Sequence, residues 1–335
     1  MNLGIVGAGR IGANHAKILD GLPRVSALII ADVDPERAEQ LAASLPKARA
    51  TDVESVFEMS DCLLIASSTD THAGFLTRAA AAGLPTFCEK PIALDLESTL
   101  AAVAATEAAG IAVQMGFQRR YDPGIRSIRT QIESGDLGTP FLVRSQTHDP
   151  APPPIDYIPG SGGIFKDCLI HDIDAVRYVT GQEVVAVTAF GTGIGHPEIA
   201  AQGDFGTATA MFQLSGGTLG QVSGLRLDPV GYDVRFEAFG SLLAVAAGWS
   251  DRTPIVSTEP GVPPPGDPIV TFWDRFDLAY RAELEAFIRV AGGEEAPACG
   301  PRDALENLRA AIACDRSAAE KRTVALEEIP GAAGR

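Results

Sequence analysis

A glycine-rich turn stands within the first dozen residues, directly after a short apolar run. The turn reads Gly7-Ala8-Gly9-Arg10-Ile11-Gly12 and matches the pattern G-x-G-x-x-G. Between a strand and a helix, the first glycine makes a tight turn, the second lets the backbone approach a pyrophosphate, and the third allows close helix packing. The amides at the helix start then face the phosphates. This pattern predicts a parallel α/β sheet that binds a dinucleotide.

An acidic residue follows at the spacing that this fold requires. Asp32 ends the second apolar run, about 20 residues beyond Gly12, where its carboxylate can accept hydrogen bonds from ribose hydroxyls and repel a 2′-phosphate. NAD is therefore favoured over NADP, although Arg37 in the next segment could meet a 2′-phosphate. A plain loop with Asp32 as a helix cap is the structural alternative. The register of strand, turn, helix and acid favours the cofactor site.

The first part of the chain alternates short apolar runs with alanine-rich segments, as strands joined by crossover helices do. We expect an N-terminal α/β Rossmann domain over residues 1–117. Its predicted strands are 3–6, 26–31, 62–66, 86–88 and 111–115, and its predicted helices are 11–19, 35–45, 72–82 and 96–109.

After residue 118 the strand-like segments follow one another with few helices between them, which is typical of antiparallel sheets. We expect an α+β C-terminal domain over residues 118–335 with a large, mostly antiparallel open sheet. Its predicted strands are 141–147, 184–190, 207–214, 219–225, 234–238 and 242–246, and its predicted helices are 125–134, 166–179, 275–290 and 302–320.

Charge and composition narrow the possible partners. The formal net charge of −16 opposes nucleic-acid binding but not a small neutral substrate. The longest apolar runs are far short of the ~20 residues of a membrane helix, and no targeting segment precedes the first strand. Five scattered cysteines without paired spacing indicate reduced thiols and no metal site. We therefore expect a cytoplasmic protein with no metal, nucleic-acid or membrane partner.

Two further stretches carry candidate catalytic groups. Lys90 follows a predicted strand in Glu89-Lys90-Pro91, at the sheet edge where ligands bind, and its ammonium can stabilise charge on a substrate oxygen. Asp167 and His171 stand four apart on a predicted helix, with Asp174 three further along the same face, so an aspartate could orient an imidazole that acts as general base. A surface lysine and a helix cap would explain these residues separately. Because these residues occur together with the cofactor motif, we favour the catalytic interpretation.

Together these motifs resemble the Gfo/Idh/MocA oxidoreductases over essentially the whole chain. The resemblance rests on the glycine motif, on Glu-Lys-Pro at 89–91, on Gly-Phe-Gln-Arg-Arg-Tyr-Asp-Pro at 116–123 and on Gly-Gly-x-x-x-Asp-x-x-x-His at 162–171. Within that family, residues 149–154, 231–233 and 273–283 are most similar to inositol 2-dehydrogenases.

The resemblance implies NAD-dependent oxidation of a ring secondary alcohol of a cyclitol, with myo-inositol first. It also implies a homodimer or homotetramer assembled through the C-terminal sheet, and catalytic roles for Lys90, Asp167 and His171. The predicted substrate-binding residues are Lys90, Arg120, His148, Asp167, His171, Asp174 and Tyr232. With the glycine pattern and Asp32, the predicted cofactor-binding residues are Gly7, Gly9, Arg10, Ile11, Gly12, Asp32, Ser67, Thr69, His72, Glu89 and Lys90.

Two departures from that branch bear on the substrate. His148 stands before Asp149-Pro150 where arginine is expected, and residues 225–230 are less basic than expected. A dehydrogenase of a related pyranose or deoxysugar is therefore the alternative, because discrimination between epimers depends on placed hydrogen bonds. A non-catalytic NAD-binding regulator is the second alternative. The intact set of Lys90, Asp167 and His171 argues against it.

Overall fold

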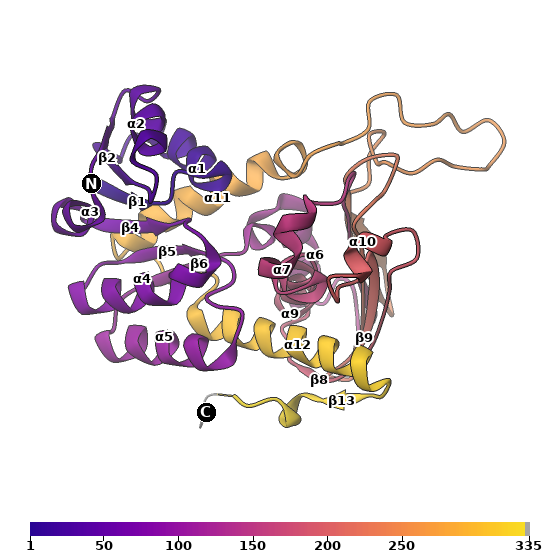
Figure 1. The fold of residues 1–335 in the computed structure, drawn as a ribbon. Helices are drawn as coiled ribbons and strands as arrows, with labels where there is room; N and C mark the ends of the chain where they lie inside the picture. The colour runs from indigo at the N-terminus through magenta and orange to yellow at the C-terminus, as the bar shows by residue number, and fades with distance from the viewer. Residues whose placement is uncertain (332–335) are drawn as a thin grey trace. The chain divides into compact units, whose positions relative to one another are not determined.

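The computed structural model describes residues 1–331, which form two compact units (Figure 1). Unit 1 comprises Met1–Gln118 and Tyr280–Glu306, and unit 2 comprises Arg119–Ala279 and Asn307–Gly331. Helices α11 (Phe272–Ala291) and α12 (Pro301–Glu320) therefore supply residues to both units. The domain boundary expected after residue 117 stays a prediction.

Unit 1 contains a six-stranded parallel sheet of order β3-β2-β1-β4-β5-β6. The strand order reverses between β1 and β4, which is the switch point where open α/β sheets bind ligands. The strands are β1 (Asn2–Val6), β2 (Ala27–Ala31), β3 (Ala48–Ala50), β4 (Cys62–Ile65), β5 (Thr86–Glu89) and β6 (Val113–Gly116).

Helices cover both faces of this sheet. A buried cluster joins Val56 and Phe57 of α3 and Ala79 of α4 to β1, β2 and β4. On the other face, α1 and the later part of α11 contact β5, where the rings of Phe87 and Phe287 lie 5.7 Å apart. The helices of the N-terminal segment are α1 (Arg10–Asp20), α2 (Pro35–Ala43), α3 (Val53–Met59), α4 (Thr69–Ala82) and α5 (Leu96–Ala109).

The sequence prediction missed β3 and α3. The three residues of β3 are at least partly exposed, so they lack an apolar signal, and α3 buries few side chains in its seven residues. One local signal was available, because Asp52 caps α3 by accepting a hydrogen bond from the Ser55 amide at 2.9 Å.

Unit 2 contains a seven-stranded sheet of order β12-β11-β7-β10-β9-β8-β13. Only β7 and β10 pair in parallel, and the other neighbours are antiparallel. The predicted fold class is thereby confirmed. The strands are β7 (Pro140–His148), β8 (Val184–Thr192), β9 (Thr207–Leu214), β10 (Leu219–Leu225), β11 (Asp233–Gly240), β12 (Ala244–Ala247) and β13 (Val324–Ala325).

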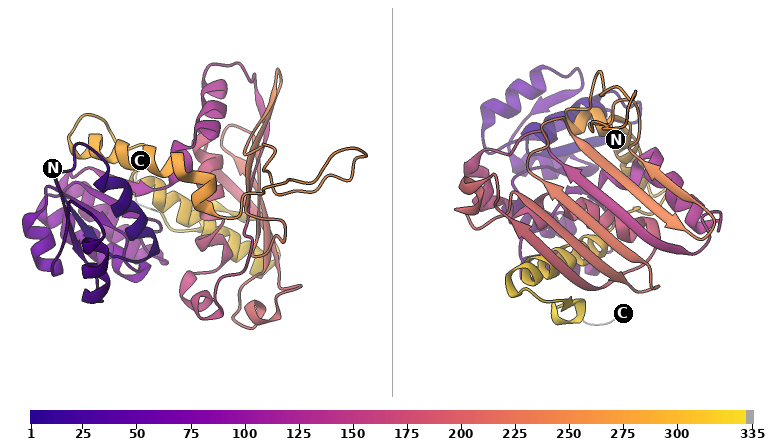
Figure 2. Two further views of the ribbon diagram at one scale, coloured as in Figure 1. Left: turned by 90° about the horizontal axis from the view of Figure 1, so that it is seen from above. Right: turned by 90° about the vertical axis from the view of Figure 1, so that its right-hand side faces the viewer.

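The two faces of this sheet differ. Helices α8 and α9 and the end of α12 lie against one face, while the described chain places no helix over the other face, as Figure 2 shows. Phe190 and Met211 are more than half exposed on the open face. The remaining helices of this segment are α6 (Pro123–Glu133), α7 (Ile158–Ser161), α8 (Ile164–Asp167), α9 (Ile170–Thr180) and α10 (Pro197–Ala200).

Two properties of the whole described chain complete the fold. None of the helices within residues 1–331 has the length and apolar character needed to cross a membrane. All five cysteines are buried, and burial raises the pKa of the Cys62 thiol to about 12. Burial likewise raises the pKa of Cys88, Cys168 and Cys314.

Candidate active site

The turn between β1 and α1 is built on three glycines with different surroundings. Gly7 has a φ of +107°, and a Cβ there would lie 2.5 Å from the Ala66 carbonyl at the end of β4. A Cβ on Gly12 would lie 1.9 Å from the Gly7 oxygen, whereas a Cβ on Gly9 would meet nothing within 4 Å. Gly7 and Gly12 are thus required by packing inside the chain. Gly9 leaves open space for a molecule outside it.

Asp32, directly after β2, ties that strand to the turn. Its Oδ2 accepts a hydrogen bond from the Ala8 amide at 2.6 Å, and its Oδ1 accepts one from the Asp34 amide at 2.9 Å. Arg37 is half exposed and donates to Oδ1 at 3.3 Å. The carboxylate therefore lies beside the glycine turn with Arg37 already paired to it.

These residues fit a dinucleotide. Helix α1 has Gly9 at its N-cap, no side-chain cap and no acidic residue in its first turn, so the amides of Arg10, Ile11 and Gly12 begin a helix that favours an anion. The open space at Gly9 and the carboxylate of Asp32 lie at the same turn. A pyrophosphate with an attached ribose requires this combination.

The segment after β4 lies at the same edge of the sheet. Ser67 and Thr71 share a hydrogen bond between their hydroxyls at 2.6 Å, and Thr69 begins α4. His72 is buried, with Nδ1 2.8 Å from the Pro91 carbonyl oxygen and Nε2 3.1 Å from that of Ser67. Its ring therefore bridges the turn after β4 and the segment after Lys90.

Lys90 directly follows β5 and is partly buried. Its backbone amide donates to the Glu89 carboxylate at 3.2 Å, and the other oxygen of that carboxylate lies 2.7 Å from Nε2 of His15 in α1. The carboxyl ends of β1, β2, β4 and β5 thus gather the predicted cofactor-binding residues of unit 1 at one edge.

In unit 2 the predicted continuous helix over 166–179 is interrupted. Helix α8 ends at Asp167 and α9 begins at Ile170. The cause is a hydrogen bond from the Leu169 amide to the Ile164 carbonyl, five residues back, which shifts the helical register. The expectation that Asp167 shares one helix face with His171 and Asp174 was therefore wrong, since four-residue spacing aligns side chains only along an unbroken helix. His171 and Asp174 remain three apart within α9.

Asp167 takes part in a buried ionic chain. It accepts hydrogen bonds from the Tyr157 hydroxyl and from Arg226, both at 2.8 Å. Arg226 is 2% exposed and also donates to Asp204 at 3.2 Å. Asp204 in turn accepts from the Ile164 amide at the start of α8. Arg226 therefore fixes Asp167 and the beginning of α8 together.

A partly buried carboxyl group, that of Asp149, lies next to this set of ionic contacts. Burial raises the pKa of Asp149 to about 6, partly opposed by the positive charge of Arg226. The Cys168 thiol donates to Asp149 at 3.7 Å. Burial also raises the pKa of Tyr232, which feels the charges of both Arg119 and Asp149. The pKa of Asp149 is also raised by the negative charge of Asp167.

Arg120 and Asp174 are brought together as a buried pair. The guanidinium donates to Asp174 through Nε and Nη2 at 2.6–3.1 Å, and Asn307 donates to the same carboxylate at 2.7 Å. Asp174 is fully buried. Arg120 and Asp174 therefore fix each other's side-chain orientation.

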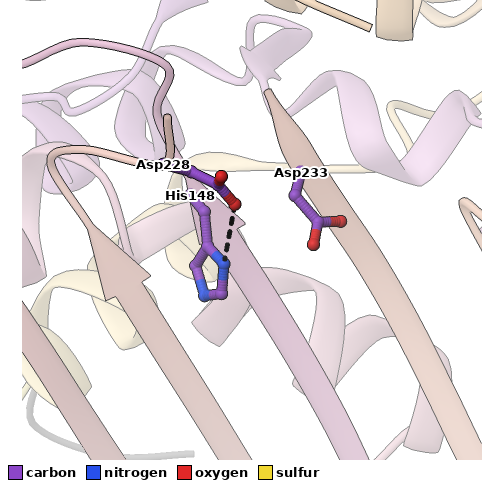
Figure 3. A group of neighbouring side chains, drawn as sticks. All are labelled: His148, Asp228 and Asp233. Carbon is purple, nitrogen blue, oxygen red and sulfur yellow. Dashed lines mark ion pairs between the residues drawn. The ribbon is translucent and has the colours of Figure 1, made fainter. Parts of the chain in front are cut away.

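His148 lies on the open face of the sheet, at the end of β7. Its Nε2 is 3.2 Å from the Ser223 hydroxyl. Its Nδ1 is 3.8 Å from Asp228, and Figure 3 marks this ion pair beside Asp233. Burial lowers the pKa of His148, partly opposed by Asp233 and Asp228. These three could hold a cation, but Arg235 already donates to both oxygens of Asp233 at 2.9 and 2.8 Å. Hydrogen bonds and ion pairs account for the cluster.

Sequence reasoning missed Asp149, Arg226 and Tyr157 as members of the site. Arg226 and Asp167 are separated by 59 positions, so no local pattern joins them. Strand alternation carried a usable signal for His148. Ser145 and Thr147 hydrogen-bond Asp172 on the helix-covered face, which places residue 148 on the opposite one.

Comparisons with known proteins agree with this geometry. Residues 1–117 match the model of an oxidoreductase family with an NAD-binding Rossmann fold, and residues 125–244 match that of the GFO/IDH/MocA C-terminal domain. A myo-inositol dehydrogenase from Streptomyces leeuwenhoekii is 41% identical, over 95% of this chain and 97% of its own length.

Two solved structures share the complete fold. A myo-inositol dehydrogenase from Corynebacterium glutamicum superposes with a TM-score of 0.88 at 36% identity, covering 97% of this chain and 98% of that one. A scyllo-inositol dehydrogenase from Lactobacillus casei, with bound NAD(H) and scyllo-inositol, superposes with a TM-score of 0.88 at 26% identity, covering 98% and 99%.

The glycine turn predicts different outcomes for two matched variants. Gly12→Ala should lower the free energy of unfolding by ~1–3 kcal/mol, because its Cβ would overlap the Gly7 oxygen. Gly9→Ala should leave stability close to wild type yet weaken NAD binding about tenfold, the equivalent of ~1.4 kcal/mol of lost contact. Thermal unfolding and calorimetric titration with NAD measure both. Equal NAD affinity in Gly9→Ala and wild type would contradict the cofactor placement.

Asp149 predicts a pH-dependent change in stability. The folded carboxyl keeps its proton up to about pH 6 while the unfolded one loses it near 3.8, so stability falls as pH rises between these values. Asp149→Asn should therefore gain on the order of 1–3 kcal/mol over wild type at pH 8, and little at pH 4. Denaturant unfolding at both pH values checks this. If the free energy of unfolding differs between Asp149→Asn and wild type by the same amount at pH 4 and pH 8, the raised pKa of Asp149 is contradicted.

Proposed function

The chain belongs to the Gfo/Idh/MocA oxidoreductase family and is an NAD-dependent dehydrogenase acting on CH–OH groups, and from that membership we propose that its substrate is myo-inositol or a close cyclitol. The product would be the corresponding 2-keto cyclitol. Oxidation of the alcohol releases one proton and transfers two electrons with the second hydrogen to NAD.

The place of Lys90 and the similarity to known inositol dehydrogenases support this proposal. Lys90 stands at the end of β5, at the sheet edge that holds the glycine turn and Asp32. The 41% identity to a myo-inositol dehydrogenase extends over nearly the whole chain, so the support reaches both units. The relatives with myo-inositol and scyllo-inositol in their names support a cyclitol over an open-chain alcohol.

The proposed catalytic roles come from the resemblance to the family, and the side chains have the chemistry that these roles need. NAD, when bound, supplies the two-electron acceptor. His171 takes the hydroxyl proton as general base, and the Lys90 ammonium stabilises the negative charge that develops on the oxygen. Asp167 grips a substrate hydroxyl or supports the charged imidazole. Arg226 and Tyr157 keep its carboxylate oriented.

Recognition of a neutral polyol rests on hydrogen bonds rather than charge. Tyr232 is a predicted substrate contact that is buried in the structure. Arg120, His148 and Asp174 stay predictions as substrate contacts. Glu89, Ser67, Thr69 and His72 stay predicted cofactor contacts, with His72 acting through the two carbonyls that it bridges.

Assembly and location belong to the same proposal. The open face of the sheet in unit 2, with Phe190 and Met211 exposed, is a surface that a second copy can cover, giving a homodimer or homotetramer. A cytoplasmic location accords with five buried thiols and with a soluble NAD pool as cofactor source.

A substrate screen tests the function. Cyclitols and aldoses are offered with NAD and NADP, and the absorbance of the reduced nicotinamide is followed. We expect the highest kcat/KM with myo-inositol and NAD, because Asp32 opposes a 2′-phosphate. Turnover of an aldose but no cyclitol would replace the proposal with a sugar dehydrogenase. No turnover, with NAD binding intact, would indicate a regulator.

His171 predicts a specific kinetic loss. His171→Ala should lower kcat by ~10²–10⁴-fold, the contribution of a positioned general base, with the Kd of NAD nearly unchanged. The ascending limb of kcat/KM against pH should also disappear. His196→Ala is the matched control, since His196 precedes α10 near Glu198 and has no assigned role. A His171→Ala enzyme with wild-type kcat and the same ascending limb would remove His171 from the mechanism.

A further inference from the structure

A fully buried histidine lies behind the proposed catalytic lysine. His15 is in α1, has 0% exposure, and places Nε2 2.7 Å from Oε1 of Glu89. Its Nδ1 has no hydrogen-bond partner within the described chain. The rings of Phe87 and Tyr280 pack around it at 5.5 and 5.8 Å. The only polar bond of this imidazole is thus the one to Glu89.

Glu89 connects that imidazole to Lys90. Its side chain is 14% exposed, and Oε2 accepts the Lys90 backbone amide at 3.2 Å. Gly116 on β6 makes room for the carboxylate, because a Cβ there would lie 2.9 Å from Oε2. One carboxylate therefore holds both α1, through His15, and the backbone of Lys90.

Burying a histidine in this way destabilises the fold, which suggests that the side chain has a positioning role. Burying the imidazole sacrifices hydration that its hydrogen bond to Glu89 restores only in part, whereas an apolar side chain would fill the same space without that cost. Helix α1 starts at the glycine turn and runs for 11 residues, with His15 in its second turn. The glycine turn is therefore linked to Lys90 through α1, the hydrogen bond between His15 and Glu89 and the bond from the Lys90 amide to Glu89.

We propose that His15 is a positioning residue that, through Glu89, fixes Lys90 relative to the nucleotide-binding turn. This inference rests on the proposed function only in that Lys90 acts on the substrate. The bond needs a donor at the place of Nε2. A glutamine side chain can present its amide N–H at that distance from the backbone, while asparagine presents it one bond closer and leucine offers none.

Three variants separate the inference from a general packing role. With a substrate found in the screen, His15→Leu and His15→Asn should lose ~10–100-fold in kcat, as expected for a misplaced catalytic group, while the Kd of NAD changes less than about threefold. His15→Gln should retain most of kcat. A wild-type kcat in His15→Leu would overturn the inference. So would an equal loss of kcat in His15→Gln and His15→Leu when the two variants have the same melting temperature.

A second measurement needs no activity. The lysines are reductively methylated with ¹³C, and the Lys90 methyl signal is assigned with Lys90→Arg. We expect it to shift in His15→Leu and in Glu89→Gln, and to stay in place in His15→Gln and in the control His196→Leu. The signals of Lys17, Lys47, Lys166 and Lys321 serve as internal references. An unmoved Lys90 signal in both variants would overturn the inference even if the enzyme is active. If the Lys90 signal moves but the protein turns over no substrate, the positioning role of His15 is supported and only the proposed function fails.

Discussion

The close approach of α1 to the turn that precedes it governs the cofactor-binding unit. Gly12 lies so near the Gly7 carbonyl that no side chain fits between them, and Gly7 itself lies against the backbone of Ala66, directly after β4. This contact sets the direction of α1 against the sheet. The Ala8 amide is thereby brought to Asp32, and the imidazole of His15 to Glu89. This one backbone contact therefore helps to position the cofactor turn, Asp32 and the segment that carries Lys90.

Paired buried charges perform the corresponding role in the second unit. Arg119 and Arg120 follow one another in the chain, and each binds a different aspartate of α9, Asp172 or Asp174. Residues two apart on a helix point in different directions, so the two arginines clamp the helix from separate sides. Asp172 is also hydrogen-bonded by two hydroxyls of β7. Removing one partner of such a pair leaves an uncompensated charge, so these pairs define a single arrangement of α9 on the sheet.

The sequence predicted the parts whose physical cause is local. The glycine turn, the helix of α5 and the alternation in β7 each depend on neighbouring residues, so their patterns could be recognised. The break between α8 and α9 could not, because it depends on which carbonyl the Leu169 amide selects. The partners of Asp167 could not either, since Arg226 is 59 positions away and Tyr157 lies in a separate short helix. Family resemblance indicated which residues matter, while their hydrogen-bond partners required the fold.

The buried cysteines have a practical consequence. Alkylating and disulfide-forming reagents attack thiolates, and burial disfavours the thiolate of Cys62, Cys88, Cys168 and Cys314 while keeping reagents away. Cys299 is buried as well. The natural thiols of the folded chain should therefore react only slowly with maleimides. A single cysteine introduced on an exposed helix would accept a fluorophore or spin label selectively, without first removing the natural thiols.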